Sequence, residues 1–282
     1  MDDFLFGTVG SPISTPAKPG GSIGAVIHTA TLGLGALELG WVRSVRVSEK
    51  TCTEIRTTGQ THGVALSVHA PYYINLNADE NEWPKSRQRL MDAARYGALA
   101  GATDIVFHPG SYFGRSPEEV LPTATARLAT CQQELHRTGI FVTLRPETMG
   151  KSAMLGSLED TLHMSRAIEG VEPCLDFAHL YARPGDGSLN DRAAWERMLS
   201  AYANALGEAS LRRLHIHLSG IAYGPKGEKE HLPLADSGLD LQAIFDALHT
   251  FGCAGRILCE SPIMEEDARF MQKTWQATAA QS

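Results

Sequence analysis

Short apolar runs alternate with longer amphipathic segments along the whole chain. This alternation is typical of parallel strands joined by helical crossovers, and it repeats without interruption from one end to the other. The expected strands are residues 5–10, 37–43, 65–70, 104–109, 140–147, 172–177, 211–218 and 256–260, and the clearest expected helices are residues 84–99, 118–136, 157–168, 193–206 and 239–250.

Eight strands are the number that closes a (β/α)8 barrel. No linker rich in Pro, Gly or Ser divides the chain, because the Pro-rich stretch near residue 15 follows the first strand too closely to be a domain boundary. The pattern therefore predicts an α/β fold, a single-domain TIM barrel over residues 1–277, with a loose C-terminal tail over residues 278–282.

Composition narrows the class of protein. The chain has 282 residues, 43% of them hydrophobic, and a net charge of -7, which excludes disorder and a chain-wide basic surface for nucleic acid. Any DNA binding must then come from a local basic patch. Five cysteines without a C-x-x-C pair fit free thiols in a reducing compartment. With no signal peptide and no apolar run as long as a membrane span, we expect a cytoplasmic protein.

Residues that can ligate a metal follow six consecutive expected strands, where each strand ends. They are His69, His108, Glu147, Asp176, His217 and Glu260. One such residue alone is more often a helix cap or a loop hydrogen bonder, but six in register favour a shared site, because the strand ends of a barrel surround one opening. Imidazoles and carboxylates gathered there require a cation, and these donors suit zinc or manganese.

Two residues lie one layer deeper on the same strands. His215 precedes His217 by two positions, so we expect it to face inward and support the ligands without binding metal itself. Arg145 stands in the same relation to Glu147, and we expect it to pair with a carboxylate such as Glu38 inside the barrel. The remaining histidines that fall outside this register are expected on the surface or in ordinary packing: His28, His62, His136, His163 and His249.

The stretches that carry these residues resemble the endonuclease IV family of apurinic/apyrimidinic endonucleases, which belongs to the xylose isomerase-like TIM barrel superfamily. They are VHAPYYINL at 68–76, FHPG at 107–110, PET at 146–148, LDFAH at 175–179, HIH at 215–217 and CESP at 259–262. The resemblance implies three zinc ions. It implies His69, His108 and Glu147 as ligands of the first, Glu147, Asp176, His217 and Glu260 of the second, and His179 and His231 of the third.

The sequence departs from the family at the third metal. The family has an aspartate two residues before the second histidine, and this chain has Lys229 there. A lysine ammonium is a poor ligand, so we expect a weaker third site or a replacement ligand from Glu228 or Glu230 in a long loop.

The loops that contact DNA in the family also differ. Arg43 and Arg46 follow the second strand, and Lys226 and Lys229 follow the seventh, so these cations are the candidates for contacts with DNA. Tyr72 and Tyr73 are candidates for packing against a distorted duplex, with apolar packing under their own loop as the equal alternative.

Two enzyme classes fit this set of residues. The first is a zinc-dependent deoxyribonuclease that hydrolyses DNA on the 5′ side of abasic sites, with Glu147 at its catalytic centre and two or three metals, Zn2+ or Mn2+, per chain; no obligate protein partner is evident. The second is a sugar isomerase or epimerase with one divalent metal in the quartet of Glu147, Asp176, His217 and Glu260. The acidic net charge favours the isomerase. The four further histidines favour the nuclease, and loss of the third site would leave a metal-binding protein without catalysis.

Overall fold

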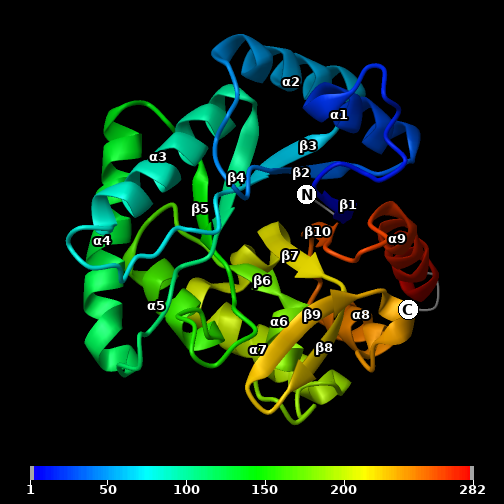
Figure 1. Cartoon of the computed structure of the whole chain (residues 1–282). Coiled ribbons are helices and arrows are strands. Elements are labelled where there is room, and N and C mark those ends of the chain that lie inside the picture. Colours follow the sequence, from blue (N-terminus) through cyan, green and yellow to red (C-terminus); the bar gives the residue numbers. More distant parts are fainter. Residues whose placement is uncertain (1–2, 280–282) are drawn as a thin grey trace.

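Eight parallel strands lie side by side in one sheet that curves around a central axis (Figure 1). The computed structural model describes residues 3–279, and the strand order is β5-β4-β3-β2-β1-β10-β7-β6. The predicted TIM barrel is therefore confirmed, and each expected strand is present within a few residues of its expected bounds. The strands are β1 (Phe4–Val9), β2 (Ala36–Gly40), β3 (Ala65–His69), β4 (Ala102–Phe107), β5 (Thr143–Pro146), β6 (Cys174–Asp176), β7 (Leu214–Leu218) and β10 (Gly255–Cys259).

The barrel closes between β5 and β6 through isolated bridges instead of a continuous ladder. These bridges join Leu144 to Val171 and Glu147 to Cys174. Pro146 lies in β5 and Pro173 directly precedes β6, and proline has no backbone N–H to give to a ladder. Few backbone hydrogen bonds therefore join β5 and β6, the two strands between which the barrel closes.

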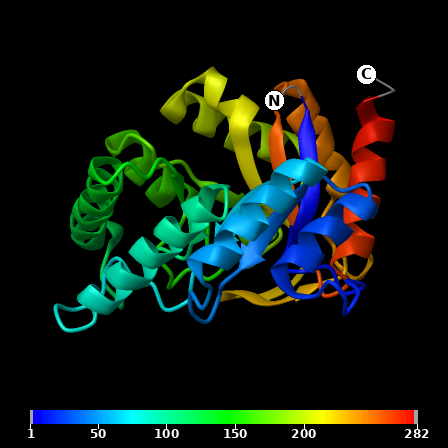
Figure 2. The ribbon, with the colours of Figure 1, turned by 90° about the horizontal axis from the view of Figure 1, so that it is seen from above.

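Helices form an outer layer around the strands (Figure 2). The five expected helices are all present, and the remaining ones occupy segments for which no clear helix was expected. The α-helices are α1 (Gly21–Thr31), α2 (Glu49–His62), α3 (Trp83–Leu99), α4 (Pro117–Arg137), α5 (Leu158–Ala167), α6 (Phe177–Ala182), α7 (Arg192–Leu206), α8 (Leu241–Thr250) and α9 (Glu265–Ala279), and the 3-10 helices are η1 (Glu208–Arg213) and η2 (Leu234–Asp236).

Strand residues alternate between an apolar outer face and a polar interior. Val68, Ile105 and Ile216 are fully buried in the hydrophobic core between strands and helices. Their neighbours His69 and His217 belong to the opposite face, since successive side chains of a strand point to opposite sides. The apolar core thus lies outside the barrel, and the interior is left for charged and hydrogen-bonding groups.

A buried ion network fills the amino-terminal end of the barrel. Arg145 Nε lies 2.7 Å from Asp104 Oδ1, and a second arginine, Arg256, lies 3.1 Å from the other oxygen of the same carboxylate. Arg145 also lies 3.3 Å from Glu172. Arg145 pairs with a buried carboxylate as expected, but this is Asp104 and not Glu38, because the Arg145 side chain extends toward this end of the barrel while Glu38 faces the histidines nearer the other end.

A β-hairpin follows β7 where the sequence suggested a long loop. Strands β8 (Gly220–Gly224) and β9 (Gly227–Leu232) pair antiparallel. Viewed from above, the hairpin lies across the end of the barrel opposite the N-terminus (Figure 2). It carries His231 and so delivers a side chain to the carboxyl ends of the barrel strands.

Helix α9 continues to Ala279, so the part of the expected tail that the structure describes, residues 278 and 279, is helical. Residues 280–282 lie outside the described residues. Within residues 3–279, every helix is too short or too polar to cross a bilayer.

We predict that Asp104→Asn destabilises the fold by about 3–5 kcal/mol, because it leaves two buried guanidinium groups without their shared counter-charge. Burial opposes the charge on Asp104, yet Arg145 and Arg256 hold the pKa of this carboxyl well below its usual value. A lowered folded-state pKa stabilises the fold above the unfolded-state pKa of about 3.9 and loses that effect as the pH falls below it. Urea unfolding at pH 7 and pH 3 measures both effects.

The matched control is Glu196→Gln, which breaks the exposed pair with Arg192 on the surface of α7. It should change the unfolding free energy very little. Equal effects of the two substitutions would contradict the importance of the buried network.

Candidate metal centre

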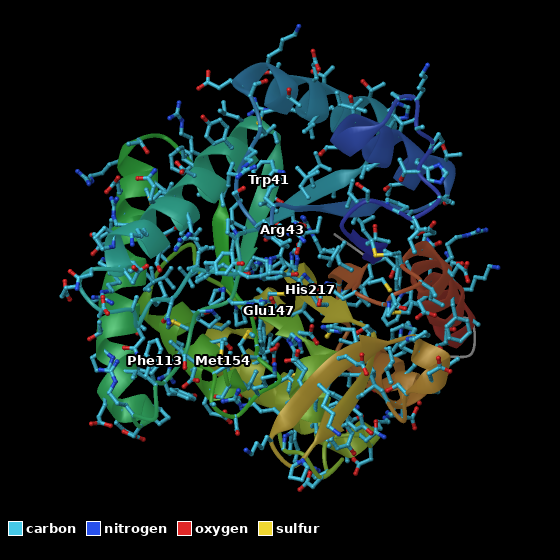
Figure 3. The ribbon with its side chains drawn as sticks, viewed as in Figure 1. Trp41, Arg43, Phe113, Glu147, Met154 and His217 are labelled. Carbon is cyan, nitrogen blue, oxygen red and sulfur yellow. The ribbon has the colours of Figure 1, made fainter. Side chains whose placement is uncertain are left out.

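The structure brings all eight predicted metal-ligating residues together at the carboxyl ends of the strands. They form three adjoining groups whose candidate ligand atoms lie within 4.8 Å of one another in each group. Glu147 and His217 lie together near the centre of the barrel (Figure 3). The groups are His69, His108 and Glu147; Glu147, Asp176, His217 and Glu260; and Asp176, His179 and His231.

Glu147 is the residue that joins the groups. Its carboxylate is fully buried, and its Oε2 lies 3.2 Å from His69 Nε2 and 3.3 Å from His108 Nε2. Its Oε1 lies 3.3 Å from His179 Nδ1 and 3.5 Å from His217 Nδ1. One side chain from the end of β5 thus contacts imidazoles from four other segments.

Several of these imidazoles are held through one ring nitrogen by a backbone carbonyl or a hydroxyl. His69 Nδ1 lies 3.0 Å from the Ala70 carbonyl oxygen, and His179 Nδ1 lies 2.9 Å from that of Thr148. A carbonyl only accepts hydrogen bonds, so in the neutral ring this nitrogen carries the proton and the other offers its lone pair. His231 Nδ1 is similarly held 2.7 Å from Ser219 Oγ, which leaves its Nε2 facing Glu260 at 3.5 Å.

His179 reaches the site because Asp176 caps the helix that carries it. Asp176 ends β6, and its Oδ1 accepts a hydrogen bond of 2.7 Å from the backbone N–H of His179. An N-cap aspartate starts a helix in this way. The cap places His179 on the first turn of α6, with its ring beside the second oxygen of Asp176 at 3.3 Å.

A carboxylate from β2 lies directly against His217. Glu38 Oε1 lies 3.0 Å from His217 Nε2, while Glu38 Oε2 accepts hydrogen bonds from Ser67 Oγ at 2.7 Å and His215 at 2.9 Å. All four side chains are fully buried. His215 supports the site from beneath as expected, but sequence analysis missed Glu38 as its partner. The available signal was a glutamate inside the apolar run ALELG, in register with Ser67 on the next strand.

Glu228, and not Lys229, lies at the third group. Glu228 Oε2 is 3.6 Å from His179 Nε2, whereas Lys229 and Glu230 are exposed. In the hairpin, Glu228 pairs with Tyr223 and Glu230 with Ala222, so Lys229 is the extra residue of a β-bulge. The bulge breaks strict alternation and lets Glu228 and His231 face the same side.

The gathered carboxylates dominate the electrostatics. Burial disfavours a charge on His69 and His179, yet hydrogen bonding and attraction to Glu147 raise the pKa of His69 to about 9, and Asp176 and Glu147 raise that of His179 to about 10. Burial, together with the nearby carboxylates Glu260 and Glu147, raises the pKa of Asp176 to about 6 despite the attraction of His179. The site therefore attracts positive charge strongly.

The donor set fits a divalent cation. Among the described residues, Glu147 Oε1, Asp176 Oδ2 and His217 Nδ1 are buried without a hydrogen-bond partner. Buried polar atoms are normally satisfied, so three unsatisfied ones beside each other indicate a ligand that completes them. Nitrogen and carboxylate oxygen together suit zinc or manganese.

The residues expected to contact DNA lie on loops that open on the same face. Arg43 and Arg46 follow β2 and are exposed, and Lys226 and Lys229 are exposed on the hairpin. Tyr72 is half exposed and Tyr73 about two-thirds exposed, so neither is buried under its own loop. Figure 3 shows Trp41 and Arg43 on one side of Glu147 and His217.

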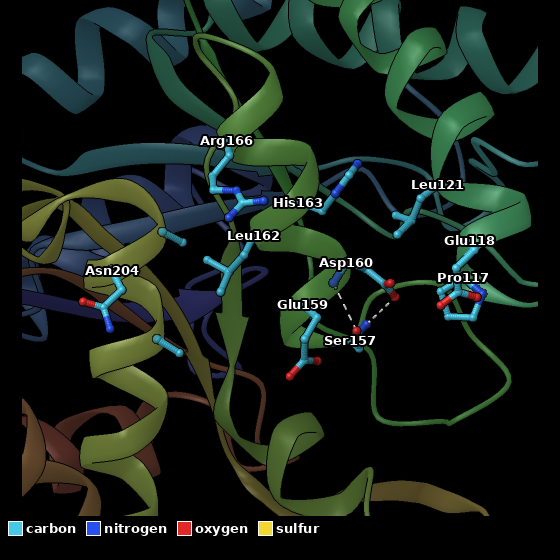
Figure 4. Close-up of a pocket in the computed structure, with 12 residues that line it drawn as sticks. Pro117, Glu118, Leu121, Ser157, Glu159, Asp160, Leu162, His163, Arg166 and Asn204 are labelled. Carbon is cyan, nitrogen blue, oxygen red and sulfur yellow. Dashed lines mark hydrogen bonds between the residues drawn. The ribbon is translucent and has the colours of Figure 1, made fainter.

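A separate groove of about 670 Å³ lies between α4, α5 and α7 in the outer helical layer (Figure 4). Its wall includes the capping box at the start of α5, in which Ser157 and Asp160 bond each other's backbone N–H groups. These polar groups are satisfied by each other. The groove contains none of the three groups of candidate ligands.

Known proteins support both the fold and the resemblance. The chain is 36% identical over 272 residues to "Uncharacterized protein MJ0133" of Methanocaldococcus jannaschii, with 96% of each chain covered. It is 28% identical over 235 residues to endonuclease 4 of Thermus thermophilus, and the aligned region covers 80% of this chain and 82% of that protein.

Among solved structures, an endonuclease IV from Thermus thermophilus has a TM-score of 0.70 at 22% identity, covering 98% of this chain and 100% of that one. A D-tagatose 3-epimerase-like protein has the same TM-score at 17% identity, covering 97% and 96%. Identities this low show a shared fold alone. The family described as xylose isomerase-like TIM barrel matches residues 27–276, and the chain belongs to this family.

Proposed function

We propose that the protein is a metal-dependent phosphodiesterase that cleaves DNA on the 5′ side of abasic sites, with two or three zinc ions per chain. The ligands would be His69, His108, Glu147, Asp176, His179, His217, His231 and Glu260, with Glu228 in place of the family's aspartate. Sequence similarity to an endonuclease 4 over most of the chain supports this assignment.

The observation that carries the proposal is the number of ligands around Glu147. A single-metal centre is complete with Glu147, Asp176, His217 and Glu260. This protein adds four further imidazoles in contact with that quartet's carboxylates, at His69, His108, His179 and His231. Extra histidines in ligand geometry are unnecessary for one cation and are expected for several.

Charge leads to the same conclusion. Five carboxylates share the pocket: Glu38, Glu147, Asp176, Glu228 and Glu260, each at most 17% exposed. One divalent cation would neutralise only two of these charges, and burying the rest without compensation is costly. Two or three divalent cations would balance them and leave the histidines neutral, the form in which imidazole ligates a metal.

When bound, such ions would supply Lewis-acid stabilisation of the negative charge on a phosphodiester. The chain's own contribution is to hold the ligands in place. Glu38 lies 3.0 Å from the His217 ring and supplies its counter-charge, and the Asp176 cap fixes His179. The exposed cations Arg43, Arg46, Lys226 and Lys229 supply a local positive rim for the DNA backbone on a chain whose net charge is -7.

A sugar isomerase or epimerase is the second candidate. The quartet of Glu147, Asp176, His217 and Glu260 is sufficient for it, and an epimerase-like protein shares the fold at a TM-score of 0.70. The two functions separate in one experiment. Incubation of the purified protein with an abasic duplex and with ketoses, alongside metal analysis, should give strand scission, two or three metals per chain and no sugar conversion.

Glu147→Gln should abolish metal binding and abasic-site cleavage together, because it removes the charge shared by two groups of ligands. We expect at least about a 100-fold loss of cleavage, more than is typical when an outer partner of a ligand is lost. Elemental analysis and a gel-based cleavage assay measure both. The exposed carboxylate variant Glu266→Gln serves as the control, and two retained metals with near-normal cleavage in Glu147→Gln would refute the assignment.

Glu228→Gln should weaken one metal selectively, by roughly 10- to 100-fold. This ion should leave first during titration with a chelator, while the ions at Glu147 remain. Lys229→Ala is the matched control from the same bulge, and we expect no change in metal content because the lysine is exposed. Greater sensitivity of Lys229→Ala than of Glu228→Gln would mean that the bulge does not select Glu228.

Glu38→Gln should lower metal affinity by roughly 10- to 100-fold although it removes no metal ligand, since the charge of Glu38 favours the proton on His217 Nε2. Ser67→Ala removes one hydrogen bond from the same carboxylate but leaves its charge, so its effect should be smaller. Competition with a chromogenic chelator measures both affinities. Identical affinities in the wild type and Glu38→Gln would show that His217 needs no such support.

A further inference from the structure

A cleft lined by exposed aromatic rings opens directly beside the metal centre. We call it the aromatic cleft and define it by Tyr72, Tyr73, Arg89, Phe113 and Met154, which line a cavity of about 360 Å³ together with His108. Tyr73 and Phe113 are 66% and 63% exposed. Phe113 and Met154 lie together to one side of Glu147 (Figure 3). His108 belongs to both the cleft and the first group of candidate ligands, so a molecule in the cleft reaches the centre.

The backbone of Phe113 is strained for an aromatic residue. Its φ is 52°, in the left-handed region that side chains with a Cβ rarely adopt. The loop holds it there through a 3.1 Å hydrogen bond from its N–H to Ser111 Oγ. A strained residue whose ring stays mostly in solvent gains little from packing, and such strain is concentrated at functional sites.

Two of the loops that line the cleft are tied to each other. Ser111 and Met154 form an antiparallel bridge between the loops after β4 and β5. Arg183 holds the second loop by donating hydrogen bonds to the carbonyls of Met149, Lys151 and Met154 at 2.8–3.1 Å. The aromatic cleft is therefore built in advance of any ligand.

Ring contacts connect the cleft to the ligands. The Tyr72 ring stacks on His108 with centroids 5.0 Å apart and planes 25° apart, and it meets His69 edge-on at 5.3 Å. Tyr72 is half exposed, so part of this residue remains open to the cleft that it lines. The cleft therefore continues the stack of rings outward from the centre.

The charges of the cleft favour a neutral planar group over an anion. Asp79 and Glu82 line it together with Arg89, the one lysine or arginine of the lining, whose guanidinium lies 5.8 Å from the Tyr73 ring centroid. The Asp79 carboxylate disfavours a phosphate within the cleft, while Glu82 is paired with Lys85, 2.7 Å away. Asn75, which also lines it, carries a side-chain amide that can bond the edge of a heteroaromatic ring.

We propose that the aromatic cleft binds the base of the nucleotide on the 5′ side of the abasic site, whose 3′-phosphate lies at the metal centre, and that this base stacks between the rings of Tyr73 and Phe113. This inference rests on the proposed function and deepens it, because it requires the strand beside the cleaved bond to be unstacked. Stacking on aromatic side chains is the usual way in which proteins bind single-stranded bases.

The test compares binding of deoxyadenosine 3′-monophosphate and deoxyribose 3-phosphate to the purified, metal-containing protein by calorimetry. The two probes share the sugar phosphate and differ in the base. We expect the nucleotide to bind at least tenfold more tightly. Phe113→Gly and Tyr73→Ala should each reduce that preference by roughly tenfold, and Phe113→Tyr, which keeps a ring, should retain it.

Two controls separate the effect from misfolding. Phe141→Ala removes an exposed ring from the segment before β5, at the other end of the barrel, and should change neither affinity. Phe113→Gly should unfold at a higher temperature than the wild type, since glycine accepts a positive φ without strain.

Equal affinity for the two probes in the wild type, or an unchanged preference in Phe113→Gly, would overturn the proposal. Cleavage of an abasic duplex is measured separately on the same preparations. Cleavage without a base preference would refute the aromatic cleft alone. A base preference that depends on Phe113, without cleavage, would support the cleft and refute the endonuclease.

Discussion

The buried negative charge of Glu147 is the constraint on which the rest of the structure depends. Its carboxylate is out of contact with water and lies within 3.5 Å of imidazoles from β3, β7, α6 and the loop after β4. A charge in this position is tolerable only if its neighbours are held in place and carry compensating charge. The ring nitrogens of His69 and His179 that are held by backbone carbonyls meet the first requirement, and the raised pKa values of these two histidines, which favour their charged forms, meet the second.

The buried ion network that stabilises the barrel and the candidate metal ligands lie at opposite ends of the barrel axis. At the amino-terminal end, Asp104, Arg145 and Arg256 satisfy one another, and no candidate metal ligand lies among them. At the carboxyl end, buried polar atoms of Glu147, Asp176 and His217 lack partners within the described residues. The apolar core surrounds both ends from outside, between strands and helices. Chemistry can therefore vary at one end without loss of the packing that maintains the fold.

Periodicity in the sequence was sufficient to predict the eight strands and the convergence of His69, His108, Glu147, Asp176, His217 and Glu260, because both follow from local patterns repeated in register. What it could not predict depends on contacts between distant segments. Arg145 was paired with the wrong carboxylate because a sequence pattern indicates the face of a strand but not the direction in which a long side chain extends. The β8–β9 hairpin was missed because its strands are short and rich in glycine. The role of Glu228 depends on a bulge that only the paired strands define.

The thin seam between β5 and β6 gives the position of Glu147 an added meaning. Glu147 itself forms one of the bridges that close the barrel, with Cys174, and its side chain contacts residues that follow β6 and lie in β7. Two prolines remove backbone N–H donors from this junction. Contacts between side chains at the carboxyl end of the barrel therefore replace part of the missing backbone hydrogen bonding. A metal ion bound by both Glu147 and Asp176 would link the two strands at this junction. Binding at this centre and closure of the cylinder are then thermodynamically linked, and occupancy of the site would contribute directly to the free energy of folding.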